Sequence, residues 1–112
     1  VATGVDRPVP GRKRRHYVNF FGRPSPQSTG YISTALAAEV PVIVVTALMF
    51  PDGTYGFQYA DPIPMVKVGS KLDNIKHNTE NVLAQVEKFI RSTPGQWLMY
   101  YPVWPDLLGQ DL

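Results

Sequence analysis

A long amphipathic pattern in the last third of the chain constrains the fold most. From about residue 72 to 91, apolar residues recur at helical spacing and charged residues fill the other face. The apolar positions are Ile75, Val82, Leu83, Val86, Phe89 and Ile90. Asp73 suits the first turn, Glu87 and Arg91 form a favourable pair four residues apart, and Pro94-Gly95 ends the helix. The pattern predicts a helix that packs against the rest of the chain.

The first third of the chain predicts a short strand followed by a helix. Residues 16–21 are β-prone and stop at Gly22, and Pro24 and Pro26 indicate a connection. Ser28 or Thr29 can cap a helix that runs to about residue 39. Its small-residue face comprises Ile32, Ala35, Leu36 and Ala38.

The middle of the chain predicts a buried strand and a hairpin. Residues 40–45 are continuously apolar, which is typical of a central strand buried on both faces. Strand, helix and strand then form a βαβ unit. Pro51-Asp52-Gly53 predicts a turn into a strand over residues 54–59, whose alternation indicates one wetter face. The predicted fold class is therefore α/β.

Length and composition indicate one domain at most. The chain has 112 residues, of which 44% are hydrophobic. We divide it into a basic loop (1–15), a βαβ unit plus hairpin (16–60), a linker (61–71), a helix (72–93) and an aromatic tail (94–112). The absence of cysteine excludes disulfides and thiol chemistry. The start resembles no signal peptide, and the apolar run 40–50 is shorter than the roughly 20 residues that span a bilayer.

Five contiguous residues, Arg12, Lys13, Arg14, Arg15 and His16, concentrate positive charge in a chain of net charge +2. Such a run can meet nucleic acid, anionic headgroups or an acidic protein. It can equally be a solvated loop, because the preceding prolines and glycine place it in a turn. Nucleic acid is the weaker partner, since no aromatic residues interleave the run and no recognition helix accompanies it.

The aromatic tail gathers both tryptophans and two tyrosines: Trp97, Tyr100, Tyr101 and Trp104. Rings with polar edges suit a lipid groove or a membrane interface. The alternative is a core anchor that packs against the long helix, which we favour for Trp97.

The residues themselves indicate no complete active site. There is no Gly-x-Ser-x-Gly elbow, no phosphate-binding glycine loop and no pair of histidines at metal spacing, so neither a metal nor an organic cofactor is expected. His16 lies among cations, which favour its neutral form. His77 is expected to be an exposed residue on the helix.

Read in order, several short segments resemble one family. They are Asp6-Arg7, Val18-Asn19-Phe20-Phe21-Gly22-Arg23-Pro24, Ala35-Leu36-Ala37, Val40-Pro41-Val42-Ile43-Val44, Asp52-Gly53, Asn78-Thr79 and Pro94-x-Gln96-Trp97. The chain, from about residue 5 to 108, resembles the bacterial lipid A biosynthesis (lauroyl/myristoyl) acyltransferases, with the phosphatidylinositol mannoside acyltransferases as relatives.

The resemblance implies acyl transfer from acyl carrier protein or coenzyme A to a hydroxyl of a membrane glycolipid, at the cytoplasmic face of the inner membrane. It implies a glycerol-phosphate-acyltransferase-like sheet flanked by helices. The family's general base is the His of a His-x4-Asp/Glu motif. That motif is absent, because Phe21 stands five residues after His16 and Val82 five residues after His77. The resemblance therefore implies a peripheral C-terminal half whose partner is the N-terminal half, and which is inactive alone.

The resemblance also assigns roles. Asp6 would orient the missing imidazole, and Arg7 would hold an acceptor phosphate or the oxyanion. Substrate-binding positions are Arg12, Lys13, Arg14, Arg15, Arg23, Trp97, Tyr100 and Tyr101. The basic run would meet headgroups or acyl carrier protein, and the aromatic residues would line the acyl groove.

The main alternative is a stand-alone, non-catalytic module that binds lipid or protein. A module predicts a fold with no exposed sheet edge. An enzyme half predicts an exposed strand edge and an apolar face that its missing part covers.

Overall fold

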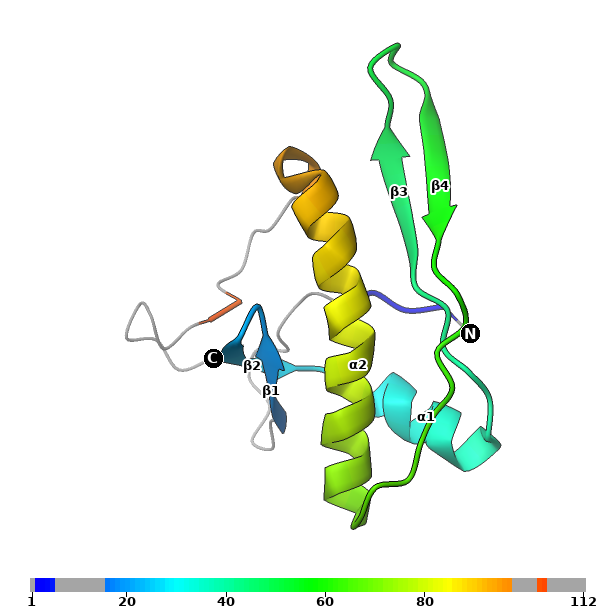
Figure 1. Cartoon of the computed structure of the whole chain (residues 1–112), viewed down its shortest axis with the longest axis vertical. Coiled ribbons are helices and arrows are strands. Elements are labelled where there is room, and N and C mark those ends of the chain that lie inside the picture. Colours follow the sequence, from blue (N-terminus) through cyan, green and yellow to red (C-terminus); the bar gives the residue numbers. More distant parts are fainter. Residues whose placement is uncertain (1, 6–15, 98–102, 105–112) are drawn as a thin grey trace.

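The computed structural model describes residues 2–5, 16–97, 103 and 104. Their elements are β1 (His16–Phe20), β2 (Arg23–Gln27), α1 (Gly30–Ala38), β3 (Val45–Met49), β4 (Tyr55–Tyr59), α2 (Lys71–Ser92) and the 3-10 helix η1 (Pro94–Gln96). The strands form two separate two-stranded antiparallel sheets. Figure 1 shows α2 in the centre, between the β1–β2 pair and the long β3–β4 hairpin. The fold is mixed α/β.

The first hairpin turns through two residues with left-handed backbone. Phe21 has φ 53° and Gly22 has φ 72°, which is the pattern of a type I′ turn. The prediction of a connection after Gly22 was wrong, because Pro24 and Pro26 lie inside β2. Their partners are Asn19 and Tyr17. Proline donates no hydrogen bond, so it fits a strand whose outer side is an edge.

Helix α1 confirms the predicted helix, but its predicted small-residue face is buried only in part, since Leu36 is half-buried and Ala38 is exposed. Ile32 and Ala35 are its buried residues. Thr29 precedes the helix without a side-chain capping bond, so the predicted capping hydrogen bond is not formed. Glu39, with φ 55°, ends the helix in left-handed backbone, and its N–H bonds to the carbonyls of Ala35 and Leu36.

The predicted central strand at 40–45 and the predicted βαβ unit were both wrong for the described residues. Strand β3 begins only at Val45, and before it Val42 forms an isolated bridge to Ile63. Val40, Ile43 and Val45 are about half exposed. A continuous apolar run predicts a strand whose two faces are both covered by other elements. Within the described chain, these residues are not covered in that way.

The predicted hairpin turn is confirmed. Gly53 has φ 87°, and the carboxylate of Asp52 accepts hydrogen bonds from the hydroxyl and the N–H of Thr54, at 2.6 and 3.0 Å. These bonds, the hydroxyl bond first, lower the pKa of Asp52. The aromatic face of β4, however, is as exposed as its polar face. Tyr55, Phe57 and Tyr59 are each at least 67% exposed.

Helix α2 confirms the predicted helix almost to the residue. Ser70 and Asp73 form a capping box at its start, and Arg91 pairs with Glu87 at 3.7 Å near its end. Its buried apolar residues are Ile75, Val82, Leu83 and Val86. Val82, Leu83 and Val86 form the core with Val18 and Phe20 of β1 and Ile32 of α1.

Candidate functional site

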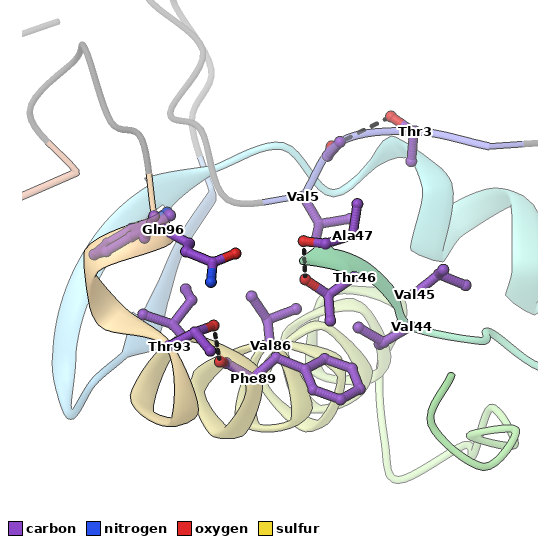
Figure 2. Close-up of a pocket in the computed structure, with 13 residues that line it drawn as sticks. Thr3, Val5, Val44, Val45, Thr46, Ala47, Val86, Phe89, Thr93 and Gln96 are labelled. Atoms are coloured by element: carbon purple, nitrogen blue, oxygen red, sulfur yellow. Dashed lines mark hydrogen bonds between the residues drawn. The ribbon is translucent and has the colours of Figure 1, made fainter. Parts of the chain in front are cut away.

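A cavity of about 300 Å³ lies between the C-terminal end of α2, the start of β3 and the N-terminal segment 3–5. Its apolar lining includes Val5, Val44, Val45, Val86, Phe89, Ile90 and Trp97, and its polar lining is Thr3, Thr46, Thr93 and Gln96. In Figure 2 the side chains of Thr46, Val86 and Gln96 point into this space. Of the described residues that line the cavity, none is charged. Its volume is at the lower end of the range of about 300–1,000 Å³ for small-molecule sites.

Gln96 builds one wall by joining η1 to β3. Its Oε1 accepts from the N–H of Met49 at 2.8 Å, and its Nε2 donates to the carbonyl of Met49 at 3.0 Å. The amide thereby occupies the outer edge of β3 as a neighbouring strand would. Residues 47 positions apart in sequence are fixed beside the cavity in this way.

Trp97 continues the wall and packs against the first hairpin. Its ring lies 6.0 Å from those of Phe20 and Phe21, between centroids. Arg91 lies over the Phe21 ring at 4.9 Å, and Glu87 accepts from the N–H of Phe21 at 2.5 Å. The Phe-Phe-Gly turn and the Pro-x-Gln-Trp ending, which are far apart in sequence, therefore form one packed unit.

Asn78 is a second amide that holds backbone. Fully buried, it accepts from the N–H of Val66 at 2.9 Å and donates to the carbonyls of Val66 and Asn74, at 2.8 and 2.6 Å. Thr79 is also fully buried, and it donates to the carbonyl of Ile75 at 2.7 Å. The Asn78-Thr79 motif thus anchors the segment between β4 and α2 and is not part of the cavity.

The structure places only some of the predicted site residues. Trp97 is partly buried and packs against the core, as the core-anchor prediction expects, and it also lines the cavity; its role in an acyl groove stays a prediction. Arg23 is exposed at the start of β2 and does not line the cavity. Trp104 is partly buried and donates to the carbonyl of Phe20 at 3.1 Å. The others lie outside the described residues: Asp6, Arg7, Arg12, Lys13, Arg14, Arg15, Tyr100 and Tyr101.

His77 is exposed as predicted and bonds to Asn81 at 3.2 Å. Within the described ranges no group of three His, Cys, Asp or Glu side chains is arranged to hold a metal ion. Sequence reasoning did not predict a site role for Thr46, Val86, Phe89 or Thr93. Val86 and Phe89 were predicted only as apolar positions of the long helix, and neither threonine carried a functional signal.

Two segments of the family resemblance line this cavity: the end of the Val40–Val44 run, and Gln96-Trp97. The sequence model of the bacterial lipid A biosynthesis acyltransferases matches residues 5–105. The chain belongs to this family. No curated protein and no solved structure matches the chain.

Family membership relates this chain to the acyltransferases of lipid biosynthesis. The described lining of the cavity is uncharged and largely apolar. No helix among the described residues is both long and apolar enough to cross a membrane.

Proposed function

We propose that this chain is part of an acyltransferase that moves a fatty acyl group from acyl carrier protein or coenzyme A to a hydroxyl of a membrane glycolipid, lipid A or a related lipid. The observation that carries the proposal is that two family segments, far apart in sequence, line one cavity whose described lining is uncharged. Burial of each methylene of an acyl chain in such a cavity contributes about 0.8 kcal/mol. The cavity is proposed to hold part of that chain.

In the proposed reaction a histidine base removes the proton of the acceptor hydroxyl. The hydroxyl oxygen then attacks the thioester carbonyl, and the thiol leaves with a proton. Neither His16 nor His77 has an acid five residues on, so the base comes from a preceding half of the enzyme, which completes the sheet around this chain. Asp6 orients that base, and Arg7 stabilises the oxyanion or holds an acceptor phosphate.

The remaining positions serve binding. The basic run Arg12–Arg15 meets anionic headgroups or the acidic surface of acyl carrier protein. Arg23 contributes a further exposed cation, and Tyr100 and Tyr101 extend the groove begun by Trp97. The enzyme acts as a peripheral protein at the cytoplasmic face of the inner membrane. Neither nucleic acid nor a further cofactor takes part.

Blocking the cavity tests the proposal. Thr93 lines it and Ser92 does not, yet both hydroxyls donate to the carbonyl of Phe89, at 3.4 and 2.7 Å. Thr93→Trp fills the cavity, and Ser92→Trp places the same ring on an exposed neighbouring position. The assay is titration calorimetry with lauroyl-coenzyme A below its micelle concentration.

Thr93→Trp should weaken binding by at least about tenfold, because it displaces at least two buried methylenes. Ser92→Trp should bind as the unmodified chain does. Equal affinities for the two variants, with both folded by circular dichroism, would contradict an acyl site in this cavity.

A further inference from the structure

A second concave surface lies between α1, the N-terminal end of α2 and the segment that leads into α2. Its volume is about 980 Å³. Figure 1 shows α1 beside the N-terminal part of α2. The apolar lining comprises Leu36, Ala37, Ala38 and Ile75, and the polar lining comprises Ser33, Thr34, Lys67, Lys71 and Asn74. None of these residues lines the cavity of the candidate functional site. This surface is here called the lysine pocket.

The lysine pocket carries two positive charges and, among the described residues that line it, no negative charge. Lys67 and Lys71 are exposed, and neither forms an ion pair with a described residue. The acid nearest to Lys71 in sequence is Asp73, and its carboxylate accepts from the N–H of Ser70 in the capping box, at 3.2 Å. Two like charges that line one pocket repel each other, so an anion bound between them is stabilised by both.

The turn between the two lysines is fixed by Asn74. Its Oδ1 accepts from the N–H of Val68 at 2.7 Å and from the N–H of Gly69 at 3.0 Å. Because both partners are donors, the oxygen faces the turn, and the orientation of the Nδ2 group is fixed as well. Asn74 is half-buried, and its Nδ2 has no hydrogen-bond partner among the described residues. The lysine pocket therefore has a fixed neutral donor besides its two cations.

The surface beside these donors is apolar. Ile75 is buried and Leu36 is half-buried. A second hollow of about 570 Å³ shares Leu36 and Lys67 with the lysine pocket and continues the apolar surface. Its other lining residues are Glu39, Val40, Pro41, Pro64 and Met65. Because Glu39 lines only the second hollow and Lys71 only the first, a ligand that fills both has its anionic end in the lysine pocket and an apolar body.

We propose that the lysine pocket binds a phosphate monoester whose organic part is apolar, such as a phosphatidic acid. A phosphate monoester carries a charge of about −1.5 to −2 near neutral pH and three acceptor oxygens, which match two ammonium groups and one amide donor. A carboxylate carries a single charge and leaves one lysine unpaired. Nucleic acid is disfavoured, because the described lining has no aromatic side chain on which a base stacks. The pocket shares no residue with the acyl cavity, so it can bind this ligand whether or not the proposed acyl transfer is correct.

Titration calorimetry with three ligands tests the chemistry of the site. Dihexanoyl-phosphatidic acid, below its micelle concentration, supplies both the phosphate monoester and the apolar part. Inorganic phosphate supplies only the anion, and dihexanoyl-phosphatidylcholine carries the same acyl chains on a phosphodiester without net charge. The phosphatidic acid should bind at least about tenfold more tightly than either, because only it uses the cations and the apolar surface together. No binding, or equal affinity for the phosphatidic acid and one of the comparison ligands, would overturn the proposal.

Charge variants locate the site. The double variant Lys67→Gln, Lys71→Gln should weaken binding of the phosphatidic acid by at least about tenfold. The control Lys76→Gln, Lys88→Gln removes the same charge from exposed positions of α2 outside the pocket, and it should bind as the unmodified chain does. Lys67→Arg, Lys71→Arg keeps both charges and should keep the binding. Equal affinities of the two glutamine variants, with both folded by circular dichroism, would refute the site.

Asn74→Asp tests the fixed donor. It keeps an acceptor for the turn but replaces the Nδ2 donor by a carboxylate oxygen, so it should weaken binding of the phosphatidic acid by at least about tenfold. Asn81→Asp makes the same change at an exposed position of α2 outside the pocket and serves as the control. Thr93→Trp, which fills the acyl cavity, should leave this binding unchanged. Binding that is lost in Thr93→Trp and kept in Asn74→Asp would assign the lipid to the acyl cavity and overturn the proposal.

Discussion

Replacing Gln96 by leucine tests whether its amide holds β3 against η1. The change removes two neutral hydrogen bonds to Met49, of 2.8 and 3.0 Å, and keeps a side chain of similar size. Each such bond contributes about 0.5–1.5 kcal/mol, and because Gln96 is exposed, water recovers part of the loss. We expect Gln96→Leu to lower the free energy of unfolding by about 1 kcal/mol, or the melting temperature by about 4–8 °C.

Urea unfolding measures the global effect, and exchange of the Met49 amide measures the local one. Gln96→Glu keeps an acceptor for the Met49 N–H but sets a carboxylate oxygen against the Met49 carbonyl, so it should be no more stable than Gln96→Leu. Gln58→Leu is the control, because Gln58 is exposed and its side chain has no hydrogen bond within the described chain. If Gln96→Leu unfolds like Gln58→Leu and leaves exchange at Met49 unchanged, the amide does not support the cavity wall.

Three further predictions follow from single side chains. Asn78→Ala should cost about 2–4 kcal/mol in urea unfolding, because three buried hydrogen bonds are lost, whereas the exposed Asn81→Ala should change stability by less than about 0.5 kcal/mol. Burial raises the pKa of Tyr31 to about 12, so the wild type should lose about 1.4 kcal/mol relative to Tyr31→Phe between pH 8 and 11. The buried Tyr31 hydroxyl has no hydrogen-bond partner among the described residues, and equal stability curves for the two proteins across that range would contradict this reasoning. Replacing all of Arg12, Lys13, Arg14 and Arg15 by serine should weaken binding to anionic vesicles or acyl carrier protein at low salt, and unchanged affinity in sedimentation would dismiss that role.

The sign of the Tyr31 prediction comes from the direction of the shift. Tyrosine is neutral below its pKa, and the folded state raises that pKa, so the full stability is present below about pH 10. As the pH rises toward 12, the unfolded chain ionises first and the folded state loses stability relative to it. Phenylalanine cannot ionise, so the difference between the two proteins isolates this residue from all other titrations.

Elements with a strong local signal could be predicted from the sequence. The apolar spacing of α2, the Ser70–Asp73 start and the Pro51-Asp52-Gly53 turn depend on neighbours within a few residues, and all three are found where such patterns place them. Strand β2 could not be predicted, since its two prolines indicate a break. They are tolerated because β2 is an edge, which only the tertiary pairing reveals.

The cavity could not be predicted from local sequence patterns either, because contacts between distant parts of the chain form it. Trp97 was singled out from the aromatic tail, but the side chains beside it come from three separate parts of the chain. Gln96 forms hydrogen bonds with a residue 47 positions away in sequence, and no sequence periodicity predicts a contact at that separation. The continuous apolar run at 40–45 predicts a strand covered on both faces, and that prediction is wrong for the described residues, because Val40, Ile43 and Val45 are about half exposed.

The family segments that the structure describes chiefly stabilise the fold. Phe21 and Gly22 make a turn, Trp97 packs on that turn, and Gln96 and Asn78 bond to backbone rather than projecting charge. None of these groups can take a proton from a hydroxyl near neutral pH. The described family segments therefore stabilise the fold and, through Gln96 and Trp97, one wall of the cavity, while the proposed proton transfer requires a base from elsewhere.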